Sequence, residues 1–315
     1  MGKANLTHLP LSNIIYFMKG GDTMRKITYK VMPEDGTSKI KSILRQKLGI
    51  SAAVLTKLKK SPDGILLNGE AAFATKNVKS GDIIEITLKD DNSPNIVPTP
   101  MELDIIYEDE DILALNKPRN MPTHPSQNHH DDTLANGVMH YFSGSGFTFR
   151  VITRLDKDTS GVVLIAKNKI AASKLSDSMA KGEIQKEYLA ICHGTLKDTK
   201  GRIDAPIGRK EGSSIMREVH PDGKPSLTQY EVTEKENQLC LVKLNPITGR
   251  THQLRVHLSH IGHPIYGDDM YGSPIEGERC RLHCRAIKFI HPITGENKIL
   301  EADIPKDFDI IKTRS

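Results

Sequence analysis

Residues 153–166, TRLDKDTSGVVLIA, join a polar, turn-prone loop to a fully apolar segment. Val162–Ala166 has the length and composition of a buried β-strand. Asp156 lies in the loop just before this strand, an order that places a reactive side chain on a rigid scaffold at the mouth of a pocket. The pattern alone is weak evidence for chemistry, because an aspartate before a turn is also an ordinary structural residue.

Short strands and helices surround this stretch along the chain. Strands are predicted at Ile105–Tyr107, Ile112–Leu115, Tyr188–Cys192 and Leu239–Leu244, and helices from Asp132 as N-cap to Phe142 and over Ala171–Ala180. The strands and helices mix without a regular β-α-β alternation. We therefore predict an α+β fold rather than a doubly wound sheet.

Two further helices and a hairpin are predicted nearer the N-terminus. The apolar spacing after Ile40 predicts a helix that ends at Gly49, and Ser51 begins a second helix. Asn68-Gly69 is a strong signal for a tight turn between two strands. The second helix leaves a cluster of lysines for its outer face: Lys57, Lys59 and Lys60.

Composition divides the chain into four parts. Residues 24–92 form a small module, residues 93–102 are polar and proline-rich and are expected to be a linker, and residues 103–315 form the main domain. Residues 1–23 are expected to be a disordered extension. The residues just before Met24 are what a purine-rich ribosome-binding site would encode if translated, so we expect Met24 to be the native start.

Length and charge limit the class of protein. With 315 residues the chain can form one sizeable core and a smaller module. Its net charge of +5 and pI of about 8.8 fit a polyanion partner but also fit many ordinary enzymes. The sequence has no apolar run of roughly 18 residues and no signal-peptide pattern, so we expect a cytoplasmic protein without a membrane partner. The sequence does not reveal the oligomeric state, and a monomer is the default expectation.

Cysteine and histidine spacing does not favour a metal site. The four cysteines are too dispersed for a disulfide framework and are expected to be free thiols. Cys280 and Cys284 flank His283, but no second ligand pair has the spacing of a metal site. The histidines of segments 124–132 and 252–263 do not place consecutive ligands on one helix face, so loop and cap roles are expected for them.

A second segment, NPITGRTHQLRVHL at residues 245–258, also carries candidate chemistry. Its proline and glycine predict a turn, and Thr251 is expected to cap a helix that Gly262 ends. This arrangement would hold Arg250 at the entrance of the helix. A near copy, HPITGE at residues 291–296, has an acidic residue where Arg250 stands, so the PITG letters indicate only a turn.

Over roughly residues 103–305 the chain resembles the RluA-type RNA pseudouridine synthases. The motifs that carry the resemblance are NKPRNMPTHPS (116–126), RLDKDTSGVVLIAK (154–167), KEYLAICHG (186–194), GRTHQLRVH (249–257) and GHPIYGDDMYG (262–272). The second and fourth of these, in that order, form a highly specific combination. The resemblance implies an α+β fold with a mixed, largely antiparallel sheet, the pseudouridine synthase fold.

The resemblance also implies roles for matching residues. The catalytic aspartate of the family falls on Asp156, and Arg250 matches an arginine that forms an ion pair with it, which would keep the carboxylate ionised and oriented. Tyr188 matches a tyrosine that stacks on the flipped base, and Arg154 an arginine that helps to fill the place it vacates. Thr153 departs from the histidine usual in the family, which puts substrate fit in doubt.

The family reaction implies neither metal nor cofactor. Uracil is detached, rotated and rejoined through C5, so atoms and oxidation state balance. Attack of Asp156 on the ribose, attack on the base and removal of a sugar proton are all left open by the sequence. A structural ion pair between Asp156 and Arg250, with Tyr188 as an ordinary strand aromatic, is the alternative interpretation of these residues.

Residues 37–90 resemble an S4 RNA-binding domain in their helices, lysine cluster and hairpin. The resemblance implies that Lys57, Lys59 and Lys60 bind RNA; a solvated lysine face on an adaptor domain is the alternative. Relatives with such a module commonly modify large-subunit ribosomal RNA, so 23S ribosomal RNA is the expected target and transfer RNA the alternative. A catalytically idle RNA-binding or ribosome-assembly factor and a glycosidic-bond hydrolase are the competing functions.

Overall fold

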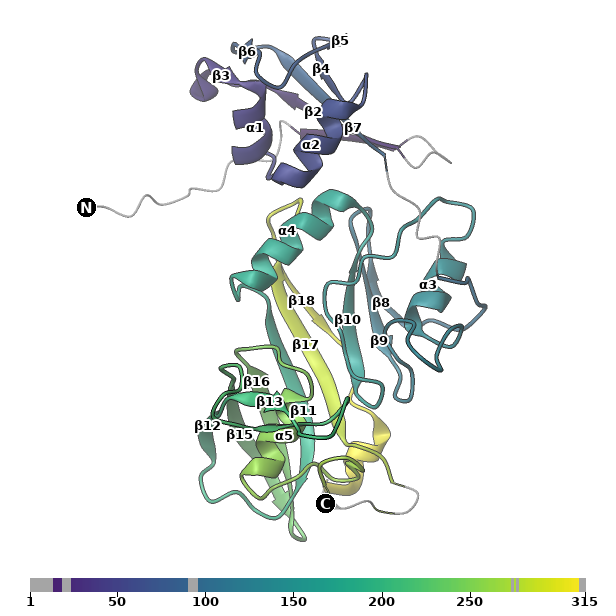
Figure 1. Ribbon diagram of the computed structural model, residues 1–315, viewed down its shortest axis with the longest axis vertical. Coiled ribbons are helices and arrows are strands. Elements are labelled where there is room, and N and C mark those ends of the chain that lie inside the picture. Colours follow the sequence, from purple (N-terminus) through teal and green to yellow (C-terminus); the bar gives the residue numbers. More distant parts are fainter. Residues whose placement is uncertain (1–13, 19–23, 90–95, 273–274, 276–277, 312–315) are drawn as a thin grey trace, which may run out of the picture.

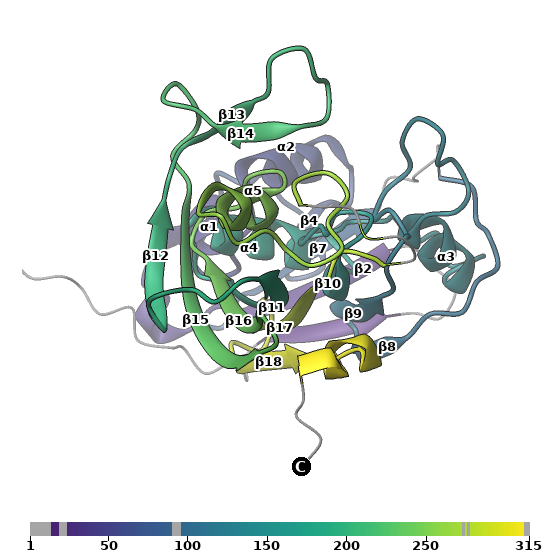
Figure 2. The ribbon, with the colours of Figure 1, turned by 90° about the horizontal axis from the view of Figure 1, so that it is seen from below.

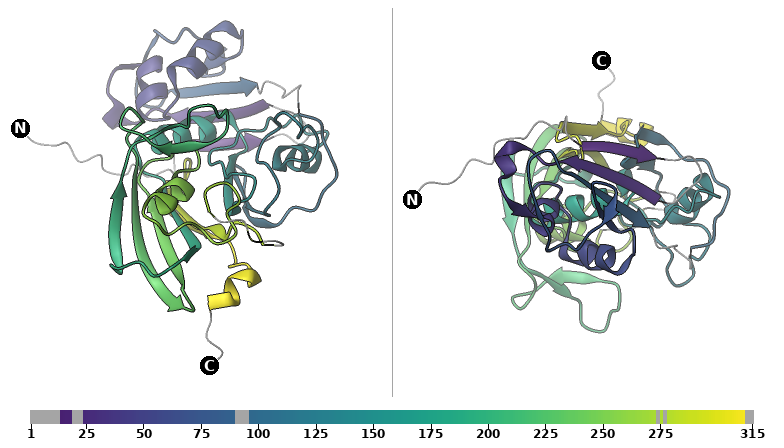
Figure 3. Two further views of the ribbon diagram at one scale, coloured as in Figure 1. Left: turned by 60° about the horizontal axis from the view of Figure 1, so that its bottom comes forward. Right: turned by 90° about the horizontal axis from the view of Figure 1, so that it is seen from above.

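The computed structural model describes residues 14–18, 24–89, 96–272, 275 and 278–311 (Figure 1). A small N-terminal module lies at one end of the molecule, and a larger domain built on one long sheet forms the rest (Figures 1 and 3). Within the described residues, no helix is both long enough and apolar enough to cross a membrane.

The N-terminal module packs two helices against a small antiparallel sheet. The helices are α1 (Ile40–Gln46) and α2 (Ala52–Lys60), with a 3-10 turn at Pro33–Asp35. The five-stranded sheet has the order β1 (Ile14–Met18), β2 (Met24–Lys30), β7 (Ile83–Lys89), β4 (Ile65–Leu67) and β5 (Glu70–Ala71), and β3 (Ser38–Lys39) pairs with β6 (Asn77–Val78).

The predicted local structure of this module is confirmed. Ser51 caps α2 by accepting a hydrogen bond from the backbone N–H of Val54 at 3.3 Å. Gly49 follows α1 with a φ of +65°, a left-handed conformation that glycine adopts without strain. Asn68 and Gly69 also have positive φ, 54° and 86°, as the expected two-residue hairpin turn requires.

The expectation of disorder over residues 1–23 is wrong for Ile14–Met18. These five residues form β1, which pairs antiparallel with β2. Their sequence, IIYFM, is rich in β-branched and aromatic residues that favour strands, and β2 offers them an open edge. The rest of the predicted extension, 1–13 and 19–23, lies outside the described residues.

The C-terminal part of the predicted linker is bonded to the main domain. Residues 96–104 form neither helix nor strand. Asn136 Nδ2 donates to the carbonyl oxygen of Val97 at 2.7 Å, and the N–H of Thr99 donates to the carbonyl of Asn136 at 3.1 Å. This part of the linker is therefore attached to the domain that follows it.

The larger domain contains a nine-stranded sheet. Along the sheet the order is β12 (Lys200–Asp204), β15 (Leu227–Glu236), β16 (Leu239–Pro246), β11 (Gln185–His193), β17 (Leu282–Ile290), β10 (Ser160–Ala166), β9 (Ile112–Lys117) and β8 (Ile105–Glu108), and β18 (Asn297–Glu301) also pairs with β17. Among these pairs, β10 and β17 run parallel and the rest antiparallel. The predicted α+β fold with a mixed, largely antiparallel sheet is confirmed.

Three helices and a projecting hairpin complete the domain. They are α3 (Leu134–Tyr141), α4 (Lys169–Ala180), α5 (Gln253–His260) and the hairpin of β13 (Ile207–Arg209) and β14 (Arg217–Val219), with a final 3-10 helix at Lys306–Ile311 (Figure 2). Ile170 of α4 and Ile293 join the apolar core of the N-terminal module, which links the two parts.

Two predicted helix starts are corrected. The N-cap of α3 is Thr133 instead of Asp132, because the side chain of Asn136 folds back to accept the N–H of Thr133 at 3.0 Å. The N-cap of α5 is His252 instead of Thr251, and His252 has a left-handed φ of 56°. Gly262, with a φ of 80°, follows the end of α5 as predicted.

One row of the sheet explains how segments far apart in sequence meet. Gly161 lies opposite Cys284, Cys284 lies opposite Tyr188, and Tyr188 lies opposite Leu244. A side chain at Gly161 could not fit there, because a Cβ atom would lie 2.2 Å from the carbonyl oxygen of Cys284. The loop before β10, the strand β11 and the turn after β16 are therefore brought to one place.

Candidate active site

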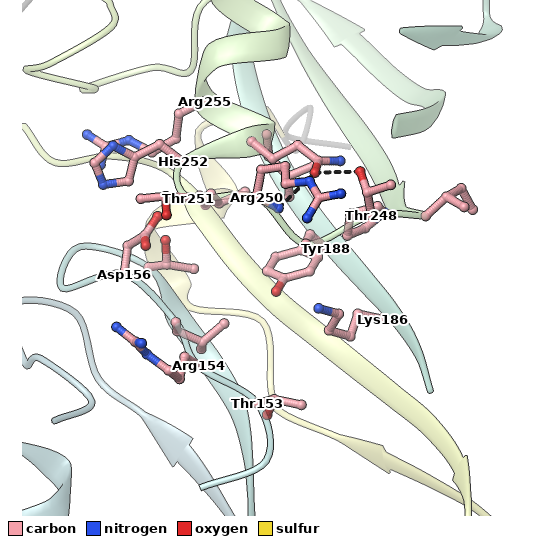
Figure 4. Close-up of a pocket in the computed structure, with 18 of the residues that line it drawn as sticks. Thr153, Arg154, Asp156, Lys186, Tyr188, Thr248, Arg250, Thr251, His252 and Arg255 are labelled. Carbon is pink, nitrogen blue, oxygen red and sulfur yellow. Dashed lines mark hydrogen bonds between the residues drawn. The ribbon is translucent and has the colours of Figure 1, made fainter. Parts of the chain in front are cut away.

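A cavity of about 470 Å³ opens where these three segments meet (Figure 4). Asp156, Arg154, Tyr188 and Arg250 all line it. The structure thus brings together the four predicted site residues of the larger domain. The other three, Lys57, Lys59 and Lys60, are exposed on α2 of the N-terminal module and do not line the cavity.

The last residue of β9, Lys117, connects the loop that carries Asp156 to the segment after β9. Lys117 is fully buried, and its Nζ donates to the carbonyl oxygens of Pro118, Met121 and Lys157 at 2.8, 2.7 and 3.2 Å. Burial lowers the pKa of Lys117 to about 7, although Asp158 and Asp156 oppose this shift. The hydrogen bonds of Lys117 fix the backbone beside Asp156.

The same loop is fixed at both ends by hydroxyl groups. Thr123 Oγ1 donates to the carbonyl of Leu155 at 2.8 Å. Thr153 is buried, and its Oγ1 accepts the N–H of Leu164 at 2.9 Å. The threonine that departs from the family pattern therefore bonds to the backbone of β10 and also lines the cavity. Ser160 Oγ lies 2.9 Å from Nδ1 of the buried His283, which ties the start of β10 to β17.

Arg255 is a buried guanidinium that has an electrostatic interaction with Asp156. Arg255 and Asp268 are both buried, and Nε and Nη2 of the arginine donate to the two carboxylate oxygens at 2.8 and 2.7 Å. Burial opposes the charge of Arg255, but the hydrogen bonds and charge of Asp268 outweigh it and raise the arginine's pKa, with a further contribution from Asp156. Asp156 lies beside His252 and Arg255 (Figure 4).

The predicted ion pair between Asp156 and Arg250 is wrong. Both residues lie in the described part of the chain, and no ion pair within 4.0 Å joins them there. Arg250 is exposed, and its Nε donates to the carbonyl of Pro225 at 3.2 Å. Figure 4 shows it beside Thr248 and Tyr188, away from Asp156.

The physical reason lies in the turn before α5. The buried Gln253 accepts hydrogen bonds from the N–H of Arg250 at 3.0 Å and from Thr248 Oγ1 at 2.7 Å, and it donates to the carbonyl of Leu227 at 3.0 Å. These bonds fix the turn so that Arg250 stays outside the helix on its exposed side, whereas Arg255 belongs to the first turn of α5 and is buried. The sequence offered a signal, since both arginines belong to one motif.

His252 is a further cavity residue that the sequence argument missed. Its Nδ1 lies 2.7 Å from the hydroxyl of Tyr271, and that hydroxyl accepts the N–H of Arg217 at 2.9 Å. Burial, opposed by the charge of Asp156, lowers the pKa of His252 and so favours the neutral imidazole.

Tyr188 lies at an irregularity of the sheet. The register of β11 against β17 shifts between Glu187 and Tyr188. As a result, Arg285 of β17 has no residue of β11 opposite it. Bulges near active sites re-aim a side chain, and here the ring of Tyr188 lies in the cavity between Lys186 and Arg250 (Figure 4). Burial raises the pKa of Tyr188, so the side chain presents a neutral ring.

The geometry supports covalent or base chemistry at a planar substrate. An aspartate faces the cavity under the influence of a buried arginine, a neutral aromatic ring offers a surface for stacking, and Arg154 is exposed at the edge. Lys186 is a second missed residue, half-buried beside the ring, and burial lowers its pKa.

A possible metal-binding group lies elsewhere. Among the described residues, Asp109, Asp111 and His291 bring ligand atoms within 4.8 Å of one another. His291 Nε2 lies 3.0 Å from Asp109 Oδ2, however, and its Nδ1 accepts the N–H of Ile293 at 3.2 Å and of Thr294 at 3.0 Å. Both ring nitrogens are therefore engaged within the protein, in a contact that joins the turn after β17 to the turn after β8.

Comparisons with known proteins point to one family. Residues 111–260 match the family model described as RNA pseudouridylate synthase. YjbO of Bacillus subtilis (strain 168), named an uncharacterized RNA pseudouridine synthase, is 39% identical over 265 residues, which cover 83% of this chain and 94% of the relative. Ribosomal large subunit pseudouridine synthase D of Escherichia coli (strain K12) is 35% identical over 261 residues, 77% of this chain and 80% of the relative.

A solved structure agrees with the sequence relatives. Human RNA pseudouridylate synthase domain containing 1 superposes with a TM-score of 0.55 and 30% sequence identity. The match covers 64% of this chain and 83% of the human chain.

Proposed function

Because the chain belongs to the RNA pseudouridine synthase family, an isomerase family, we propose that Asp156 is its catalytic carboxylate and that 23S ribosomal RNA is its target. The observation that carries the first proposal is the shared cavity. Asp156 lies there with Tyr188 and within the electrostatic influence of Arg255. No other described carboxylate lines this cavity.

The proposed mechanism begins with a uridine turned out of its RNA stack into the cavity. Its base stacks on the neutral ring of Tyr188, which leaves the polar edges of uracil free for hydrogen bonds. Arg154, at the exposed edge, enters the space that the nucleotide leaves. Arg250 contacts a phosphate of the RNA, because its guanidinium is exposed beside the cavity.

The chemical step is an isomerisation that conserves atoms. The bond from ribose C1′ to uracil N1 breaks, the base rotates, a bond from C1′ to C5 forms, and the proton lost from C5 is balanced by one gained at N1. Asp156 assists as an anion. Arg255 supplies a positive charge near it, and the hydrogen bonds of Lys117 to the neighbouring backbone keep it in place.

The choice of ribosomal RNA rests on two observations. One relative at 35% identity is named a ribosomal large subunit pseudouridine synthase. The module formed by residues 24–89 also has 13 basic and six acidic side chains, a net charge of +7 that suits a large polyanion. Pseudouridine mapping of 23S ribosomal and transfer RNA from a deletion strain decides between the two targets.

Replacing Asp156 by asparagine tests the catalytic role. Asp156→Asn should lower the single-turnover rate of pseudouridine formation by more than roughly a thousandfold while RNA affinity stays near normal, because the change is nearly isosteric but removes the charge. Asp158→Asn, in the same loop, is the matched control and should retain most activity. Substantial turnover by Asp156→Asn would refute the proposed role.

The same assay separates the competing functions. RNA with labelled uridine yields pseudouridine if the proposal holds. Release of free uracil by the wild-type protein would indicate a hydrolase, and neither product with any ribosomal or transfer RNA would indicate an idle RNA-binding factor.

A further inference from the structure

We propose that Phe73, on the N-terminal module, is a stacking platform for an unpaired RNA base. The inference rests on the proposed function in one respect, namely that the partner is RNA. It adds the part of the RNA that the module binds: a nucleotide outside a duplex and distinct from the uridine that reacts.

The exposure of Phe73 has no structural explanation within the described protein. Its side chain is 86% exposed, whereas the next most exposed large apolar residue, Ile215, is at 60%. The other phenylalanines with described side chains are buried or half-buried: Phe142, Phe147, Phe149, Phe289 and Phe308. An exposed phenyl ring adds little to the core, and a single exposed apolar residue is not by itself evidence of a site, so the inference depends on the surroundings of the ring.

The backbone presents this ring from a fixed turn. The N–H of Lys76 donates to the carbonyl of Phe73 at 2.9 Å, which closes the turn. The next residue, Ala74, is buried, and its carbonyl accepts the N–H of Lys41 at 2.8 Å. The carbonyl of Lys76 in turn accepts the N–H of Ile40 at 3.0 Å. A stacking surface held in this way loses little conformational entropy when a base binds.

The charged residues near the ring are mostly basic, although Glu70 of β5 is also exposed. Exposed lysines occur in the turn and in the segments bonded or paired to it: Lys39, Lys41, Lys76 and Lys79. They belong to the module with net charge +7, while residues 90–315 have 29 basic and 32 acidic residues, a net charge of −3. A lone aromatic ring among lysines matches how proteins bind single-stranded nucleic acid, with bases on rings and phosphates on cations.

A protein partner fits these observations less well. A stable protein interface buries a broad patch of roughly 800 Å² on each partner, with an apolar centre from which lysine is depleted. In the described part of this module, the next exposed large apolar residue is Ile83, at 41%. One ring with several lysines is therefore too small and too charged for a protein interface, but it suits one base and its phosphates.

The position of the ring separates it from the chemistry. Phe73 lies between β5 and β6, a segment at the end of the module that faces away from the larger domain (Figure 1). The active-site cavity is formed wholly by residues of the larger domain. A base on Phe73 should therefore contribute to RNA affinity and leave the rate of the bound complex unchanged.

Replacement of the ring tests the inference. We compare Phe73→Leu, Phe73→Tyr and the control Ile299→Ala, whose side chain is 59% exposed on β18. Phe73→Leu should bind a short single-stranded RNA about tenfold more weakly, whereas Phe73→Tyr keeps an aromatic ring and should bind normally. Affinity for a blunt duplex of the same sequence should not change. Wild-type affinity of Phe73→Leu for the single strand would overturn the proposal.

The composition of the chain allows a direct measurement of stacking. The protein contains no tryptophan, so Phe73→Trp introduces a single fluorophore at the proposed site. The short single-stranded RNA should quench its fluorescence, and much less so in the matched variant Ile299→Trp. Equal quenching in the two variants would overturn the proposal.

The failure of this inference is distinguishable from failure of the proposed function. Pseudouridine formation by the wild-type enzyme, together with normal RNA binding by Phe73→Leu, overturns the stacking site alone. Selective quenching in Phe73→Trp without any pseudouridine formation overturns the enzymatic proposal and supports the stacking site.

Discussion

Arg250 and Arg255 belong to one nine-residue motif but lie in different surroundings. Arg250 is exposed and bonded to a backbone carbonyl, whereas Arg255 is buried with its guanidinium on Asp268. A guanidinium shielded from water acts more strongly on a nearby carboxylate than an exposed one. We therefore expect Arg255, rather than Arg250, to be the arginine that supports Asp156.

The two arginines should respond differently to replacement by lysine. Arg255→Lys keeps the charge but loses the two-pronged contact with Asp268, so the single-turnover rate should fall roughly a hundredfold, as for other small displacements of a reacting group. Arg250→Lys should stay within a few-fold of wild type, because an exposed contact contributes little. Melting temperatures measured in parallel show whether Arg255→Lys is folded at the assay temperature. An equal loss in both variants would contradict this assignment.

Sequence alone could predict some of these residues and not others. Asp156 and Tyr188 could be placed in one site because family motifs identify them without any geometry. The roles of the two arginines depend on where α5 begins, and the sequence favours Thr251 as the cap because its hydroxyl can accept a backbone hydrogen bond. The structure instead begins the helix after His252, since the side chain of Gln253 bonds to the turn.

At the scale of elements, β10 and β17 hold the loop of Asp156 through a buried histidine. They are parallel neighbours, and Ser160 of one lies opposite His283 of the other. Burial lowers the pKa of His283 from 6.5 to about 4, so the imidazole is neutral in the folded protein at neutral pH. The stability that the contact between Ser160 and His283 contributes should therefore decrease at acidic pH.

The sign of that sensitivity follows from proton binding. Between pH 6.5 and 4 the unfolded chain protonates this histidine while the folded chain does not, so the free energy of unfolding should fall by up to about 3 kcal/mol as the pH is lowered through this range. Urea titrations at several pH values should show a shallower dependence for His283→Asn than for wild type. The exposed His140→Asn is the control, and parallel curves for all three proteins would argue against the assigned pKa.

Elements were predicted well where the signal is local. Helix α2, with Ser51 before it, and the Asn68-Gly69 turn depend on neighbouring residues alone. The row from Gly161 to Leu244 could not be predicted, because it pairs strands separated by up to about 120 residues. The same limit explains β1, whose order depends on the open edge of β2.

The whole molecule separates its charge from its chemistry. The N-terminal module carries +7, and the part of the chain with the cavity is slightly acidic. Attraction to RNA phosphates is therefore expected at one end of the molecule and isomerisation in the domain beyond it. This division is consistent with a module that supplies affinity and a domain that supplies the reaction.

Salt dependence should report this division. Replacement of Lys57, Lys59 and Lys60 by glutamine should weaken RNA binding and reduce the slope of log affinity against log salt by about two to three, if each lysine contacts a phosphate. The rate at saturating RNA should not change. The control replaces three exposed lysines of the larger domain: Lys197, Lys210 and Lys288. An unchanged slope in the first variant would exclude these lysines from the RNA-binding surface.

The burial of β10 has a consequence for how long the enzyme keeps working. All seven residues of this strand are buried, Gly161–Ala166 pair with β9, and Ser160 and Gly161 pair with β17. Segments of this kind open only when the whole domain opens, so their backbone is among the slowest in a protein to exchange hydrogen with water. Asp156 stands four residues before that strand. We therefore expect Asp156 to stay in place for as long as the domain is folded. Heat should abolish the activity at the temperature at which the domain unfolds.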